Sequence, residues 1–117
     1  MSISTHSTKR ENRYRVPIDP DDERWIYKSF ALLDDSASVD SVEVILENCE
    51  IVEALMSFGT VTTYEDETAE NTWGVKIAPL TGVNYCRVTW RCQTAISGDT
   101  ALGDQFDRTD WIPVRTL

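Results

Sequence analysis

The chain has few of the residues from which active sites are usually built. It holds one histidine, His6, and five scattered glycines in 117 residues. Serine and cysteine nucleophiles need a positioned base, and zinc needs several clustered ligands, so most such sites are excluded. Twenty acidic residues leave a carboxylate pair open, but nothing in the sequence singles out two of them. We therefore expect no enzyme activity, no catalytic residue, no metal site and no cofactor.

Long apolar runs are missing too. The first residues lack the apolar core of a signal peptide, and no run approaches the ~18 residues of a membrane helix. We therefore expect folding in a reducing cytoplasm. Of the three cysteines, Cys86 and Cys92 lie roughly 20 Å apart along one strand, too far for a disulfide. Cys49 could meet either of them, but buried free thiols are favoured.

The charge of the chain is strongly uneven. Residues 1–15 carry Lys9, Arg10, Arg13 and Arg15 against Glu11, a net +3, so a total of -9 leaves -12 on the rest. We interpret residues 1–18 as an extended basic arm and 19–117 as one domain. The arm either is a solvated terminus or docks on a neighbouring acidic subunit. Nucleic acid is an unlikely partner, because the body is acidic. The predicted partner-binding residues are Lys9, Arg10, Arg13, Tyr14 and Arg15.

Short alternating segments predict an all-β fold. In residues 85–94, Cys86, Val88, Trp90 and Cys92 share one face of a strand. Further strands are expected over 23–33, where Ile26, Lys28 and Phe30 face away from Trp25 and Tyr27, and over 60–64, 73–78 and 106–117. Turns or loops are expected at 65–71 and 97–105, and Pro113 suggests an edge or a bulge. The pattern favours an immunoglobulin-like antiparallel β-sandwich of about seven strands.

Residues 39–57 are ambiguous. Val42, Val44 and Leu46 alternate as in a strand, yet apolar residues up to Met56 also recur at helical spacing, opposite a row of glutamates. Gly59 could end such a helix. The surrounding strands favour strands here.

The four tryptophans are mainly core candidates. The alternative is carbohydrate stacking, which needs two or three exposed aromatic side chains on one face. The residues to inspect for that role are Tyr14, Trp25, Tyr64 and Trp111. Asp19, Asp21 and Asp22 superficially resemble calcium ligands, but the glycine and distal glutamate of a calcium loop are missing, so a solvated turn is expected.

Several of these short motifs occur together in one known family. Asp19-Pro20-Asp21-Asp22 precedes an aromatic strand, Gly82 precedes Cys86-x-Val88 and Cys92-x-Thr94, and Gly103 precedes Asp107-Arg108-Thr109 and Ile112-x-Val114. In these motifs the chain resembles the fiber-tail adaptor proteins of tailed bacteriophages and similar immunoglobulin-like connectors of the virion. The resemblance covers roughly residues 19–115, with most weight in 79–115.

The resemblance implies a non-catalytic structural protein of the virion. Such proteins form rings at the neck or tail and join them to tail fibers or other virion proteins, and they are assembled in the host bacterial cytoplasm. The expected partners are therefore virion proteins and further copies of the chain, with no membrane. Two alternatives stay open, a capsid decoration or head-completion protein and a carbohydrate-binding β-sandwich module.

Overall fold

The computed structural model describes residues 16–32, 37–62, 68–96 and 102–116. Their regular structure consists of strands, and none of them forms a helix long and apolar enough to cross a membrane. The six strands are β1 (Arg24–Ser29), β2 (Ala37–Glu47), β3 (Cys49–Thr62), β4 (Thr68–Pro79), β5 (Tyr85–Ile96) and β6 (Leu102–Pro113).

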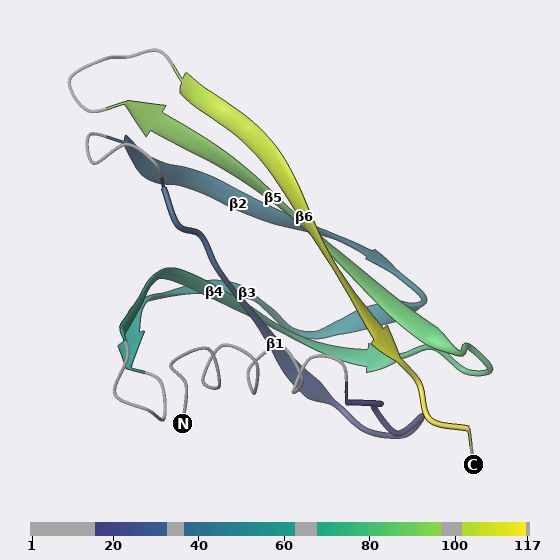
Figure 1. Cartoon of the computed structure of the whole chain (residues 1–117). Helices are drawn as coiled ribbons and strands as arrows, with labels where there is room; N and C mark the ends of the chain where they lie inside the picture. The colour runs from purple at the N-terminus through teal and green to yellow at the C-terminus, as the bar shows by residue number, and fades with distance from the viewer. Residues whose placement is uncertain (1–15, 33–36, 63–67, 97–101, 117) are drawn as a thin grey trace, which may run out of the picture.

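The strands form two antiparallel sheets that face each other as two layers (Figure 1). One sheet has the order β1-β4-β3 and the other the order β2-β5-β6. The prediction of an all-β antiparallel sandwich is confirmed. The described residues contribute six strands, against the seven or so expected from the turn signals.

The ambiguous segment consists of two long strands, so the helical alternative is wrong. β2 pairs with β5 over its whole length, and Val42, Val44 and Leu46 pack against the core. Asn48 then adopts a left-handed backbone with φ 64°, which turns the chain out of one sheet and into the other. Pairing with β5 and β4 satisfies the backbone groups that a helix would have bonded internally.

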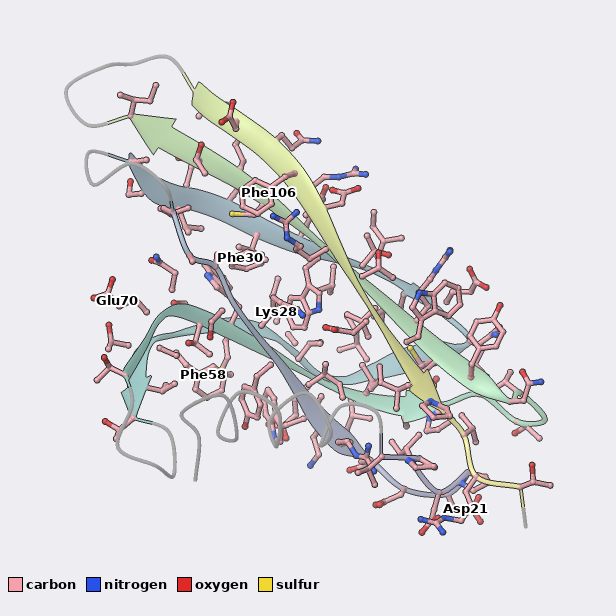
Figure 2. All side chains as sticks on the ribbon, in the orientation of Figure 1. Asp21, Lys28, Phe30, Phe58, Glu70 and Phe106 are labelled. Carbon is pink, nitrogen blue, oxygen red and sulfur yellow. The ribbon has the colours of Figure 1, made fainter. Side chains whose placement is uncertain are left out.

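The core lies between the two layers. β4 contributes Val75 and Ile77, while the predicted inward face of β5 is confirmed, because Cys86, Val88, Trp90 and Cys92 are all fully buried. Ile26 of β1 is buried as well, and Lys28 and Phe30 also lie between the layers (Figure 2). Period-two alternation therefore placed these side chains correctly.

The two ends of the described chain meet at one end of the sandwich. Ile18 is fully buried and forms a parallel bridge with Val114. Its amide donates to the Pro113 carbonyl at 2.9 Å, and its carbonyl accepts from the Arg115 amide at 2.8 Å. β6 is the outer strand of its three-stranded sheet, one of the two features that Pro113 suggested, since proline lacks the amide that a central strand needs.

Several strand boundaries differ from the prediction, and β4 and β6 both begin earlier than expected. Residues 102–105 belong to β6 rather than to a loop, and 68–71 belong to β4 rather than to a turn. Gly103 explains the first difference, because a Cβ there would lie 2.4 Å from Thr94 Oγ1 on the neighbouring strand. Gly103 permits close approach of β5 and β6, at a position where the presence of a glycine had suggested a loop.

One polar contact crosses between the layers. Asp110 of edge strand β6 accepts hydrogen bonds from Lys28 Nζ at 2.9 Å and from Trp90 Nε1 at 2.8 Å. Lys28 belongs to β1, the edge strand of the opposite sheet, so the carboxylate links both sheets along one side. The Asp110 side chain is 14% exposed, which makes this pair much less screened by solvent than a surface ion pair.

Replacing Trp90, which is buried, and Trp111, which is exposed, tests which face of each strand points into the core. Trp90→Ala should lower the free energy of unfolding by about 3–5 kcal/mol, because it empties a fully buried site. Trp111→Ala removes a side chain that is 54% exposed and should cost about 1 kcal/mol or less. Urea denaturation measures both values, and equal losses would contradict the assignment.

The inter-sheet carboxylate gives a second test. Asp110→Ala should destabilise the fold by about 3 kcal/mol, because Lys28 and the Trp90 indole both lose the acceptor they share. The matched control is Asp107→Ala on the outer face of the same strand, where loss of an exposed pair with Arg91 should cost under ~1 kcal/mol. Chemical denaturation of both variants should separate them clearly, and a loss at Asp110 no larger than the control would show that the contact contributes little.

Candidate interaction surfaces

The outer face of the β1-β4-β3 sheet carries three aromatic rings in contact. Trp25 and Tyr27 stack with ring centroids 6.1 Å apart, and Phe58 of β3 meets them edge-on at 5.7 and 5.4 Å. We call these three residues the aromatic cluster. Gly74 of β4 lies beneath it, and a Cβ there would be 2.7 Å from the Phe58 ring. The pairing of β1, β4 and β3, together with the lack of a side chain at Gly74, therefore lets the three rings meet on this face.

Acidic side chains flank the aromatic cluster. Lys76 of β4 lies 3.4 Å from Glu23 and 3.4 Å from Glu53. Hydrogen bonding to Glu53, and then to Glu23, raises the pKa of the Lys76 ammonium. Met56, also on β3, is 45% exposed beside these residues. The face thus combines exposed aromatic and methionine side chains, which are enriched at protein interfaces, with a partly neutralised pair of carboxylates at the side.

The outer face of the other sheet carries a second aromatic group around Trp111. Its ring centroid lies 5.2 Å from that of Tyr85, and the Arg87 guanidinium carbon lies 5.3 Å from the Trp111 ring. Glu47 of β2 pairs with Arg87 and accepts a hydrogen bond from the Tyr85 hydroxyl. That hydrogen bond is the main reason that the pKa of Tyr85 is raised. We call Glu47, Tyr85, Arg87 and Trp111 the Trp111 group.

The expectation that Trp111 belongs to the core is wrong. Trp111 lies opposite Arg87 in the β5–β6 register, and its neighbour Ile112 is the buried residue. Adjacent side chains of a strand point to opposite faces, so only one of the two can be inside. The alternation of Ile112 with Val114 would have identified the outward position of Trp111, and the pairing with the outward Arg87 agrees with it.

A row of charges continues along the same outer face. Arg91 contacts Asp107 through two nitrogens, at 2.9 and 3.1 Å, and lies 3.5 Å from Glu43. The hydrogen bonds from Arg91 lower the pKa of Asp107. These side chains are well exposed, so the row contributes little to stability. It gives the face a fixed pattern of charge next to the Trp111 group.

The aspartates of the predicted turn are engaged within the fold. The Asp19 carbonyl accepts a hydrogen bond from the Asp22 amide at 3.0 Å, and the Asp19 carboxylate pairs with Arg115 at 2.8 Å. Asp22 Oδ1 accepts the Glu23 amide at 2.8 Å. Across the described ranges, no three His, Cys, Asp or Glu side chains are grouped in a way that could hold a metal ion.

Only some of the predicted interaction residues lie in the part of the chain that the structure describes. The arm residues Lys9, Arg10, Arg13, Tyr14 and Arg15, and also Tyr64, lie outside the described residues. The proposed carbohydrate set does not share one face, because Trp25 and Trp111 lie on the outer faces of different sheets. The sequence missed Phe58 as a partner of Trp25 and Tyr27, because only the β3–β4–β1 pairing brings them together.

Most residues of the family resemblance have structural roles here. Gly82 has φ 80°, a backbone that favours glycine, in the turn before β5. Cys86, Val88 and Ile112 are core residues, and Gly103 allows close strand approach. Searches against protein-family models, curated proteins and solved structures find no match to this chain.

Titration of Tyr85 tests the geometry of the Trp111 group. Glu47 raises the folded pKa of Tyr85, so the hydrogen bond between them stabilises the folded chain at pH values below the ordinary tyrosine pKa of about 10. This stabilisation is lost as the pH rises through the higher folded pKa. Glu47→Gln should lower that folded pKa. Glu43→Gln, which removes the neighbour of Arg91 instead, should leave it unchanged. Absorbance titration at alkaline pH measures the effect, with Tyr85→Phe identifying the signal; equal pKa values in wild type and Glu47→Gln would contradict the contact.

Proposed function

We propose that this chain is a non-catalytic structural protein of a tailed-bacteriophage virion. In this proposal it is an adaptor that joins the neck or tail to tail fibers. Identical copies form a ring, and each copy presents two surfaces to two different partners. The chain is made and assembled in the host bacterial cytoplasm.

The observation that carries the proposal is the pair of aromatic surfaces on opposite sides of the sandwich. The aromatic cluster lies on one outer face, and the Trp111 group lies on the other. Trp111 is 54% exposed, and Met56 and Phe58 are 45% and 36% exposed. Tryptophan, tyrosine and arginine are the residues that most often dominate binding energy at protein interfaces. Two such surfaces facing away from each other suit a protein that connects two others.

We further propose that the sandwich is immunoglobulin-like. An immunoglobulin constant-type domain has strands A-B-E-D in one sheet and C-F-G in the other. If β1 is taken as strand B, the observed orders β1-β4-β3 and β2-β5-β6 correspond to B-E-D and C-F-G. The sequence resemblance to immunoglobulin-like virion connectors supports the same interpretation, with strand A as the seventh strand.

The charge distribution supports assembly of identical copies. The arm has a net charge of +3, and the remainder carries -12. An arm of one copy is attracted to the acidic body of the next, which is the arrangement that a ring of head-to-tail contacts needs. The residues assigned to this contact are Lys9, Arg10, Arg13, Tyr14 and Arg15.

Sedimentation of the purified full chain tests the arm. We expect concentration-dependent oligomers at low salt, weakened at high salt because the contact is electrostatic. Replacing Lys9, Arg10, Arg13 and Arg15 with glutamine should weaken self-association by about tenfold. Replacing Ser2, Ser4, Thr5 and Ser7 with alanine, a matched control in the same arm, should leave it unchanged. A monomer under all conditions would contradict the ring.

Imaging of virions from the source culture tests the adaptor role. Density for this chain in a ring at the neck or tail would support the proposal. Copies spread over the capsid shell would contradict it and favour a decoration or head-completion protein. If no particle contains the chain, the proposal fails, and glycan-array binding that depends on Trp111 would then favour a carbohydrate-binding module.

A further inference from the structure

Two of the three cysteines lie close together between the sheets. Cys49 is the first residue of β3, and Cys86 is the second residue of β5 in the other sheet. Cys86 Sγ donates to the carbonyl of Asn48, the residue before Cys49, at 3.6 Å, which places the Cys86 sulfur beside the start of β3. Both side chains are buried, with Cys49 8% and Cys86 0% exposed. The two free thiols therefore lie beside each other in the core, next to the turn between β2 and β3.

The topology explains why these two thiols meet. β2 pairs with β5 up to Glu47, which lies opposite Arg87, so the following residue, Asn48, comes level with Cys86. The left-handed turn at Asn48 then directs Cys49 across to the other sheet, beside the same Cys86. A disulfide needs β-carbons about 3.5–4.5 Å apart. The 3.6 Å contact of Cys86 Sγ with the carbonyl just before Cys49 puts the two residues close enough for rotation of their side chains to bring the sulfurs together.

Cys92 provides a comparison within the same strand. It shares the inward face of β5 with Cys86 and is equally buried. Six residues of extended strand separate it from Cys86, roughly 20 Å, so the two cannot be bridged. Any chemistry specific to the Cys49–Cys86 contact should therefore leave Cys92 unchanged.

We propose that Cys49 and Cys86 are a latent modification site that closes into a disulfide between the two sheets when the folded protein meets a low-molecular-weight disulfide. A protein thiolate attacks the reagent, forming a mixed disulfide and releasing one thiol. The second protein thiolate attacks the sulfur of the first, forms the Cys49–Cys86 bond and releases the other thiol. The two protein thiols lose two electrons and two protons, and the reagent disulfide is reduced to two thiols.

Burial sets the expected rate of the reaction. The interaction between the two thiols, together with burial, raises the pKa of Cys49, whereas the same interaction lowers the pKa of Cys86, so Cys86 is the thiol expected to attack first. Both sulfurs are buried, which limits their access to the reagent. The closed bond should form slowly and faster at alkaline pH. Once formed, it would tie β3 to β5 and close a loop from residue 49 to residue 86, which restricts the unfolded chain. The site is independent of the proposed virion role.

Peptide mapping of the full-length wild-type chain tests the proposal. The protein is purified with reductant, incubated with oxidised glutathione, denatured and alkylated. Trypsin places the three cysteines in separate peptides, residues 29–76, 77–87 and 92–108. We expect 29–76 and 77–87 to be linked and 92–108 to be alkylated. The melting temperature should rise by ~10 °C and return on reduction.

Three variants provide the controls. Cys92→Ser should keep both the linked peptides and the rise in melting temperature, whereas Cys49→Ser and Cys86→Ser should lose both. Mapping of the wild type decides the question even if a variant fails to fold. Three alkylated thiols after prolonged oxidation, a bond that includes Cys92, or dimers linked between chains would each overturn the proposal.

Discussion

The contact between the two sheets at Asp110 is the constraint around which this sandwich is arranged. Its carboxylate lies on an edge strand, yet it accepts hydrogen bonds from Lys28 on the edge of the opposite sheet and from Trp90 at the centre of its own. A partly buried carboxylate is stable only when charged or polar donors surround it. The position of β1 relative to β6 is therefore fixed, and the largest side chain of the core is fixed with it.

Once the layers are fixed in this way, every other strand position must face outward. The outward positions of β1 and β3 bring Trp25, Tyr27 and Phe58 together, and those of β5 and β6 bring Tyr85, Arg87 and Trp111 together. The two interaction surfaces are thus a consequence of the same alternation that fills the core. The aromatic surfaces lie on opposite sides because each sheet has only one face free.

The turn at Asn48 has two effects on the fold. Its left-handed backbone moves the chain from one sheet to the other without a long connection, so β2 and β3 are separated by a single residue. The same turn brings Cys49 beside Cys86. A residue that ends one strand and begins the next thus also determines which cysteines can react with each other.

The sequence by itself determined the strand character of most segments and which side chains of β5 face inward, because alternation is a local property that a single strand displays. The assignment of Trp111 to the core was wrong, although the alternation of Ile112 with Val114 already places Trp111 on the opposite face, and the register against Arg87 puts it outside. The contact of Phe58 with Trp25 and the proximity of Cys49 to Cys86 were decided by tertiary structure. Each joins strands that are distant in the chain, and strand pairing is a non-local interaction that local pattern does not encode.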